Sequence, residues 1–473
     1  MILFLASSAL AAPLELTYEE ALARATERNP GVRGAGADVD AAAGAVLAAR
    51  APFEPSLSAS TAWFSNTSEG TGQLGNFYAD TSGWSSSVGV SQTLVTGTSA
   101  SITLESSQTE FLYRLVDTDL DPFTGDPQYQ SSLSVTLSQA ILEGHRLAWN
   151  LQGVRSAEGA RSAAEANREV VRQEAMANTA RAYWNVRTQA ALVTIAEQTL
   201  AISEEQHRVV KALVDGGRLA PVEATRAEAA KVQAERAVID AIAAHATAQD
   251  ALLLLLGEAP GRGVTVTSNP ERPAAVTLDA DAVVARVIAG NPQLAAARVA
   301  LETRRVAVAS ARHGLLPALA ATGSYTLRGY ETDLAGSFDE LGRGELPEWS
   351  IGAQLTMPLL NRRDRGGLAQ AQADATGAEL DLAALEGTLA QEARAQVRTI
   401  EGAARDLSLA ELNVRLAEET LAAERARLDE GRALQKDVIT AIKDLDAARG
   451  EVERARAAWQ DALVALRRLE GAL

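Results

Sequence analysis

The feature that most restricts the fold of this chain is an internal repeat. One set of residues recurs 262 positions later (291 − 29), pairing Asn29-Pro30 with Asn291-Pro292, Arg50 with Arg312, and Pro55 with Pro317. A second set, G-R-x4-[D/E]-x3-A, occupies Gly217–Ala227 and Gly431–Ala441 and recurs after 214 positions (431 − 217). A chain repeated in this way is expected to build two equivalent structural units.

The two offsets locate an insertion in the first half. They differ by 48 residues (262 − 214), and the span from Pro55 to Ala140 exceeds that from Pro317 to Pro358 by 44 residues (85 − 41). The excess therefore lies in the strand region described next. We expect a signal peptide over 1–11, a first repeat over 12–260 with an extra hairpin at about 66–127, a linker over 261–276, and a second repeat over 277–473.

Alternating segments in both halves predict strands with one apolar face. Ser132–Ser138 alternates Leu or Val with Ser or Thr, and 319–329 and 349–357 follow the same two-residue period in the second half. Within the insertion, Trp84–Leu94 and Ser99–Ser106 flank a T-G-T sequence, which is typical of a hairpin. An antiparallel arrangement of strands is expected.

Long helical segments follow the strands in each half. About seventy residues, from Gly144 to Gly216, lack proline, which corresponds to roughly 100 Å of continuous helix. Residues 366–430 are similar, and each long segment has a helical partner of about forty residues, to Gly257 and to Gly471. Apolar residues at steps of three and four, as at Leu409, Leu412 and Leu416, predict coiled-coil seams in these segments.

Composition excludes several classes of protein. The formal net charge of −17 argues against a nucleic-acid-binding surface, and the lack of cysteine excludes disulfides and Cys-ligated zinc. An apolar run at Ile2–Leu10 with small residues at Ala9 and Ala11 resembles a cleavable export signal. The longest later run of purely apolar residues, Ala251–Leu256, has six, so no transmembrane helix is expected.

Export, alternating strands and long helical hairpins together favour a chain whose strands enter the outer membrane. One copy has too few strands to close a barrel, and open strand edges leave backbone groups unpaired in lipid. We therefore expect an α+β membrane protein in which subunits share one β-barrel, continuous with a long α-helical coiled-coil tube. The alternative, a soluble structural protein built on coiled coils in the periplasm, does not account for the half-apolar strands.

The order of these features resembles the TolC-like family of outer-membrane efflux proteins over essentially the whole mature chain. The resemblance rests on the E-E-A-L…N-P opening at Glu19–Pro30 with its looser copy at Asp281–Pro292, the strand pairs, Ala182–Val186, and the two G-R segments. It implies a homotrimer in the cell outer membrane with its helical tube in the periplasm.

The resemblance also implies partners and a strand number. The family acts as the exit duct of tripartite efflux pumps or type I secretion systems, with a periplasmic adaptor protein and an inner-membrane pump of the RND or ABC type. It implies four barrel strands per subunit, or twelve in the trimer. The extra hairpin at Trp84–Ser106 departs from this pattern; it could enlarge the barrel, extend the rim or fold against the barrel, and an extension at the surface is favoured.

Candidate functional residues lie at the turns of the two helical hairpins. Gly217 and Gly431 are expected in these turns, because glycine adopts the left-handed conformation at helix ends. In the family the turns form the periplasmic tip that closes the tube and contacts the adaptor, with an acidic residue six positions after each glycine. Those positions hold Glu223 and Asp437, whereas Thr440 replaces a second acidic residue of the family.

Charges at the tip suggest a constriction. In a trimer, six carboxylates from Glu223 and Asp437 would repel one another and attract cations. Arg218 and Arg432 are candidates to pair across subunits and hold the tip closed. The simpler alternative is that both acids stabilise the start of a helix through its dipole and that both arginines are solvated.

No other pattern indicates chemistry. The four histidines are scattered in the sequence, no GxxxxGK loop is present, and no nucleophile stands near a base, so neither an enzyme nor a cofactor is expected. The expected function is a passive outer-membrane conduit gated at the helical tip. A dedicated protein-secretion duct of the same fold is the alternative to small-molecule efflux.

Overall fold

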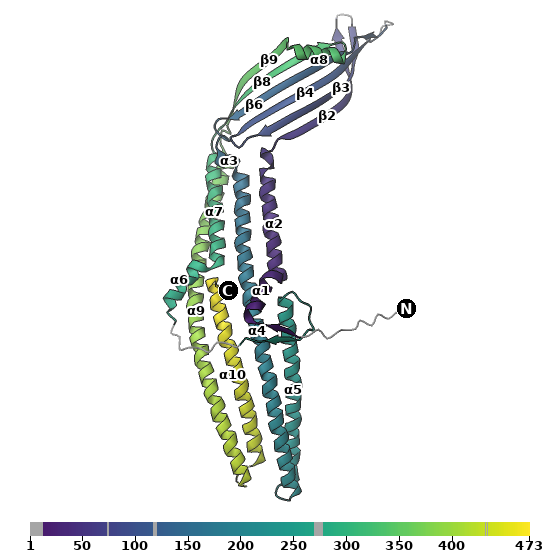
Figure 1. Cartoon of the computed structure of the whole chain (residues 1–473). Helices are drawn as coiled ribbons and strands as arrows, with labels where there is room; N and C mark the ends of the chain where they lie inside the picture. Colours follow the sequence, from purple (N-terminus) through teal and green to yellow (C-terminus); the bar gives the residue numbers. More distant parts are fainter. Residues whose placement is uncertain (1–12, 73–74, 117–120, 269–277, 431, 433) are drawn as a thin grey trace, which may run out of the picture. The chain divides into compact units, whose positions relative to one another are not determined.

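The computed structural model describes residues 13–72, 75–116, 121–268, 278–430, 432 and 434–473. The expected signal peptide (1–11) and the second half of the expected linker, from residue 269 on, lie outside the described residues. The chain forms two compact units (Figure 1). Unit 1 comprises Met1–Asp40, Ser162–Arg298 and Leu380–Leu473, and unit 2 comprises Ala41–Arg161 and Val299–Glu379, so each draws on both halves of the sequence.

Helices account for most of unit 1. The helices of the chain are α1 (Tyr18–Arg28), α2 (Pro30–Arg50), α3 (Leu147–Asn150), α4 (Gln152–Asp215), α5 (Pro221–Leu255), α6 (Ala280–Gly290), α7 (Pro292–His313), α8 (Leu334–Arg343), α9 (Arg362–Asp429) and α10 (Gln435–Glu470), with a 3-10 turn at Ala51–Phe53. The prediction of two long helices is confirmed, since α4 and α9 run for 64 and 68 residues. Each forms a hairpin, α4 with α5 and α9 with α10 (Figure 1).

The two largest apolar cores among the described residues lie in unit 1. One packs α1, α4 and α5 around the fully buried Tyr183, whose hydroxyl donates to the Leu16 carbonyl at 3.1 Å. The other packs α6, α9 and α10 around Val287 and Trp459. The short strands β1 (Leu14–Leu16) and β7 (Val264–Val266) pair in parallel beside the first core. The Tyr183 region therefore packs helices together.

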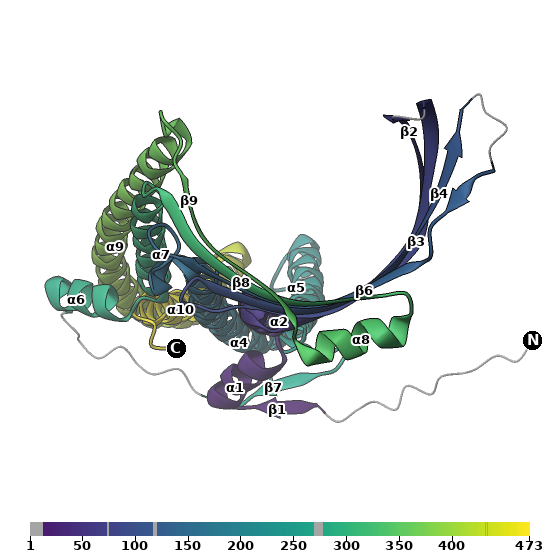
Figure 2. The same cartoon turned by 90° about the horizontal axis from the view of Figure 1, so that it is seen from above.

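Unit 2 contains a curved antiparallel sheet. Its strands are β2 (Ser56–Gly72), β3 (Gly75–Thr93), β4 (Thr98–Leu115), β5 (Phe123–Thr124), β6 (Gln128–Ala140), β8 (Ala318–Glu331) and β9 (Leu346–Thr356). Six of them pair in the order β2-β3-β4-β6-β8-β9, and the two-residue β5 pairs with β4. Figure 2 shows α8 on the convex side of this sheet, where Ser337 contacts Ser131 through their hydroxyls at 2.8 Å.

The placement expected for the extra hairpin is wrong. We expected Trp84–Ser106 at the surface, but β3 and β4 are central strands of the sheet, between β2 and β6. Pairing is continuous on both sides, from Ser56↔Ser91 on one flank to Thr98↔Gln139 on the other. The hairpin joins the sheet because its alternation of apolar and polar residues is in phase with that of both neighbours.

The passage from strand to long helix is less direct than the sequence suggested. Between β6 and α4 lie residues 141–151, which include the four-residue helix α3. Asn150 organises this segment, since its side-chain amide donates to the carbonyls of Val95 at 2.9 Å and Gly144 at 2.7 Å. The turn that joins β3 to β4 is thereby tied to the start of the helical region.

One helix meets the length and composition of a membrane span, contrary to expectation. Among the described residues α5 alone has an 18-residue window of mean hydropathy 1.4 with few charges. The many alanines of α5 raise its mean hydropathy, although polar residues between them keep each uninterrupted apolar run short. In unit 1, α5 packs beside α4, with Ala227, Ala234 and Ala248 buried.

The repeated Asn-Pro pair performs the same task twice in unit 1. Asn29 donates its side-chain amide to the Leu255 carbonyl at 2.9 Å, and Asn291 donates to the Leu469 carbonyl at 3.0 Å. The side-chain oxygen of each asparagine accepts the backbone N–H two residues on, at 2.9 Å in both cases. Each asparagine thus begins one helix and ties it to the end of another.

We predict that Asn291→Ala and Asn29→Ala each destabilise the protein by about 1–2 kcal/mol, because each leaves a buried carbonyl without its partner and removes a helix cap. Thermal unfolding of the detergent-purified protein, followed by circular dichroism, measures the effect. Asn178→Ala, at an exposed position of α4, is the matched control. Equal midpoints for all three variants and the wild type would contradict the assigned role.

Candidate functional site

The first candidate turn connects α4 to α5 in unit 1. After Asp215, Gly217 adopts the left-handed conformation expected for it, with φ of +70°. The N–H of Arg218 donates to the Leu213 carbonyl at 2.8 Å, which closes the end of α4. α5 then starts at Pro221, a residue suited to the first helical turn.

The second candidate turn connects α9 to α10. Gly431 lies outside the described residues. The N–H of Arg432 donates to the Arg427 carbonyl at 2.7 Å, and the Arg432 side chain lies 3.1 Å from the carboxylate of Glu430. Both members of this ion pair are well exposed, so water screens their attraction and it contributes little stability.

Glu223 and Asp437 both stand in the first turn of a helix and make local contacts. Glu223 pairs with Arg226, one turn further along α5, at 2.8 Å. Its other carboxylate oxygen is buried and has no hydrogen-bond partner among the described residues. Asp437 accepts the backbone N–H of Leu434 at 3.1 Å, which stabilises the start of α10.

Within one copy, these four side chains are not brought together. Arg218 is exposed, and within the described part of the chain it forms no ion pair. Glu223 forms an ion pair with Arg226, and Arg432 forms one with Glu430, so each pair lies within one hairpin. The geometry inside one copy therefore matches the simpler expectation of helix-start acids, and any convergence of the charges requires other copies.

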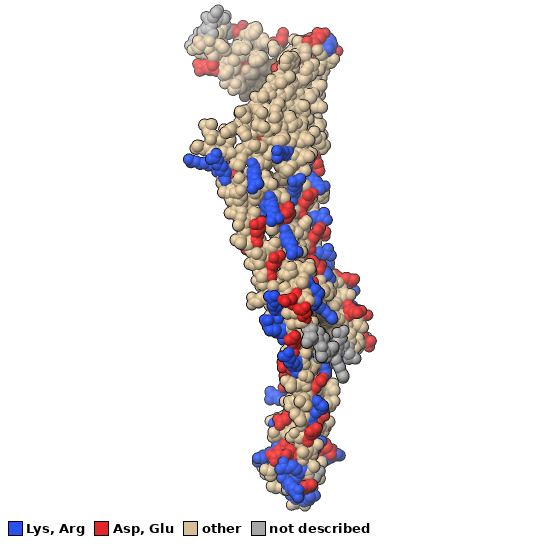
Figure 3. Space-filling view, turned by 90° about the vertical axis from the view of Figure 1, so that its left-hand side faces the viewer, with Lys and Arg blue, Asp and Glu red and all other residues tan. Residues whose placement is uncertain are grey.

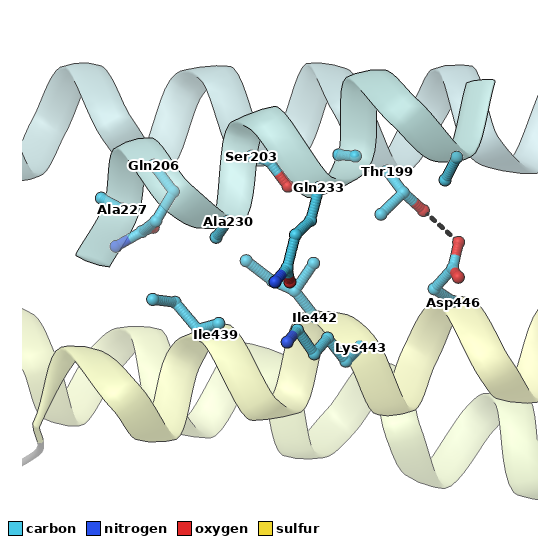
Figure 4. A pocket seen from close by; sticks show the side chains of 12 residues that line it. Thr199, Ser203, Gln206, Ala227, Ala230, Gln233, Ile439, Ile442, Lys443 and Asp446 are labelled. Atoms are coloured by element: carbon cyan, nitrogen blue, oxygen red, sulfur yellow. Dashed lines mark hydrogen bonds between the residues drawn. The ribbon is translucent and has the colours of Figure 1, made fainter. Parts of the chain in front are cut away.

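The two hairpins are joined by polar contacts that sequence reasoning missed. The Gln206 side-chain amide donates to the Gln435 side-chain oxygen at 2.9 Å, and the Thr199 hydroxyl donates to Asp446 at 2.5 Å. Both contacts link α4 to α10, and Figure 4 shows the second. Their signal in the sequence was visible, because Thr199 and Gln206 interrupt the apolar steps of the α4 seam.

A cavity of about 160 Å³ lies beside these contacts, between α4, α5 and α10 (Figure 4). Small side chains on α5, such as Ala227 and Ala230, face Ile439 and Ile442 of α10 across it. The side-chain amide nitrogen (Nε2) of Gln435 is buried near it without a hydrogen-bond partner among the described residues. The cavity removes van der Waals contact locally, but apolar packing remains beside it, where Ile202 of α4 packs against a cluster that includes Val438 and Ile442 of α10.

Charged side chains are unevenly distributed on the surface. Figure 3 shows acidic and basic side chains along the helices and gathered at the tip of the hairpins, whereas the visible strands are almost uncharged. Among the described residues no cluster of His, Asp and Glu could hold a metal ion.

Comparison with known proteins agrees with this description. The profile of the outer membrane efflux protein family matches residues 99–258 and 283–472, most of the chain. The chain therefore belongs to the outer membrane efflux protein family. It is an outer-membrane channel, a conduit and not an enzyme, and proteins of this family work with periplasmic adaptors and inner-membrane pumps. No curated protein matches the sequence.

Solved structures share the fold at low sequence identity. The crystal structure of CusC aligns with a TM-score of 0.70 at 16% identity, covering 96% of this chain and 92% of that one. VceC from Vibrio cholerae gives 0.68 at 16% identity, with 96% of each chain covered. The CmeC outer membrane channel of Campylobacter jejuni gives 0.66 at 14% identity, covering 96% and 85%.

We predict that Gln206→Leu and Gln435→Leu each loosen the contact between hairpins, whereas the double variant restores it. Each single change leaves one amide buried without a partner, at about 1–3 kcal/mol, and the double change removes both amides together. Hydrogen–deuterium exchange of the backbone over Gln435–Leu445 measures the loosening. Effects of the single changes that simply add in the double variant would show that the two amides act independently.

Proposed function

We propose that three copies of this chain assemble into one exit duct, with a shared β-barrel in the outer membrane and a shared helical tube in the periplasm. The observation that carries this proposal is that the sheet ends in unpaired edges. Within the described residues β2 pairs only with β3, and β9 pairs only with β8. In lipid such edges are costly, and neighbouring copies can cover them.

The helical layer of unit 1 supports the same assembly. Polar contacts between the hairpins run from α4 to α10, and α5 faces α10 across the cavity. Both α5 and α9 nevertheless carry large apolar side chains that are at least 42% exposed, namely Val232, Ile239 and Ile242 on α5 and Leu409, Leu412 and Leu416 on α9. A second copy that places its α9 against α5 would bury both rows and continue the layer.

We further propose that 12–260 and 277–473 are two structural repeats, joined over 261–276. The matching roles of Asn29 and Asn291 support this division. Gly257 and Gly471 also agree, since each ends the closing helix of its half with φ near +70°. Because each copy contributes two similar helical hairpins, six similar hairpins would surround the tube of a three-chain assembly.

The tip of the tube is the proposed gate and the proposed contact for the adaptor. Around a threefold axis Glu223 and Asp437 of each copy would bring six carboxylates towards the centre. Arg218 and Arg432 are the cations beside them, and the turns at Gly217 and Gly431 are the surface an adaptor would meet. Energy for transport would come from the partner pump.

The assembly is tested by expressing the chain with its export signal and separating the membranes. We expect the protein in the outer-membrane fraction, soluble only in detergent, and migrating as a heat-sensitive trimer on denaturing gels. Recovery as a soluble monomer would overturn the proposed assembly.

The gate is tested by removing its charge. We predict that Glu223→Ala combined with Asp437→Ala raises single-channel conductance and weakens cation preference in planar bilayers, because fewer negative charges line the constriction and its helix starts loosen. Unchanged conductance and unchanged selectivity would remove both residues from the gate.

Two controls separate charge from helix capping. Glu223→Gln with Asp437→Asn removes the charge but retains side-chain oxygens for the helix start, so cation preference should fall while the tip stays closed. Glu228→Ala removes one acid from an exposed position of α5 nearby and should change neither property.

A further inference from the structure

The faces of the sheet differ in chemistry along entire rows of paired residues. One row crosses all six strands and contains only apolar side chains, namely Leu57, Val90, Ile102, Val135, Tyr325 and Trp349. The adjacent row faces the other way and contains only hydroxyl side chains, namely Ser56, Ser91, Ser101, Thr136, Ser324 and Ser350. Because alternate residues of a strand point to opposite faces, the part of the sheet around these two rows has one apolar and one hydroxyl face.

β3 and β4 share this pattern with the strands on either side. On the apolar face their Val88, Val90 and Ile102 are 47–53% exposed, comparable to Val135 and Leu137 of β6 at 43% and 52%. At the end of the sheet near the helices, the turn between them is tied to its surroundings. Ala140 donates its backbone N–H to the Gly97 carbonyl at 3.1 Å, and Asn150 holds Val95. The hairpin therefore continues the sheet. Its strands pair with both neighbours, present apolar residues on the same face, and are fixed by hydrogen bonds at the same end.

The number and direction of the strands allow closure. Successive strands of the sheet are antiparallel, so with six strands β2 and β9 run in opposite directions. The β9 edge of one copy can therefore pair with the β2 edge of the next in the same antiparallel sense. The apolar row also continues across that junction, from Trp349 on β9 to Leu57 on β2.

We infer that each copy contributes six strands to the barrel, so that the assembled wall has eighteen strands where the family pattern implies twelve. The inference rests on the trimer proposed above. With about 4.8 Å between strands and a tilt of about 40°, the backbone-to-backbone diameter is about 36 Å, against about 24 Å for twelve strands. The face opposite the apolar row carries Ser and Thr together with the charged Glu105, Arg328 and Glu348, so the bore would be polar and admit water-soluble solutes wider than a twelve-strand barrel admits.

The decisive test uses the natural absence of cysteine, which allows single cysteines to be labelled one at a time. Spin labels at Val88 and Ile102 should report lipid, with strong relaxation by oxygen. Labels at their neighbours Ser87 and Thr103 should report water, with strong relaxation by a polar nickel reagent. Val135 and Ser134 on β6 serve as the matched pair for a strand that belongs to the wall without the hairpin.

The outcomes separate the two proposals. Lipid–water alternation on β3, β4 and β6 supports the eighteen-strand wall. Alternation on β6 alone, with both β3 and β4 sites in water, would overturn the wide barrel and leave the trimeric duct standing. Water at all sites, β6 included, would overturn both.

A deletion of residues 73–125 provides a second readout. It removes β3, β4 and β5 and brings β2 beside β6 with antiparallel directions preserved. Polymer exclusion measured from the barrel side with graded polyethylene glycols should then show a bore reduced to about two-thirds of its width, following the ratio of strand numbers. An unchanged exclusion limit in a heat-sensitive trimer of the deletion variant would contradict the inference.

Discussion

The structure depends on one constraint, the need of every backbone N–H and C=O of a membrane-embedded sheet for a hydrogen-bond partner. The sheet of this protein satisfies that need internally from β2 to β9 and fails only at its two outer edges. The apolar row and the hydroxyl row would then meet lipid and water respectively. Sharing the wall among copies, as proposed, would remove the remaining edges, so the proposed assembly follows from the same requirement that shapes each strand.

The helical layer of unit 1 also has groups that lack partners within one copy, but these are apolar side chains instead of backbone groups. Among the described residues, α4 contacts α10 through polar side chains beside a cavity, and α5 and α9 expose apolar rows. In the proposed tube these rows would lie against neighbouring copies. Within unit 2, the segment around Asn150 joins the strands to the start of α4 at the point where the chain changes its secondary structure.

Much of the fold could be predicted because its signals are local. Absence of proline located α4 and α9, alternation located the strands, and the repeated Asn-Pro marked helix starts that the structure places in matching environments. The position of the extra hairpin could not be predicted, because a two-residue period is the same for a wall strand and a surface strand. Only the register of pairing, which is not local, distinguishes them.

The candidate site was less predictable for the same reason. The Glu223–Arg226 pair has the i,i+3 spacing of a helix and is predictable from the sequence. We instead predicted Arg218 as the cation at this tip. The contacts of Thr199 with Asp446 and of Gln206 with Gln435 join residues more than 200 positions apart, and they require knowledge of how α4 lies against α10. The polar interruptions in the α4 seam indicated where to look but not what they would meet.

Electron cryomicroscopy of the detergent-purified protein tests the central claim, that an incomplete sheet is completed by identical copies, most directly. The account predicts a particle with threefold symmetry in which β9 of each chain pairs with β2 of its neighbour and no strand edge faces lipid. A single chain with free β2 and β9 edges, or an assembly joined through the helices alone with the sheets separate, would contradict it.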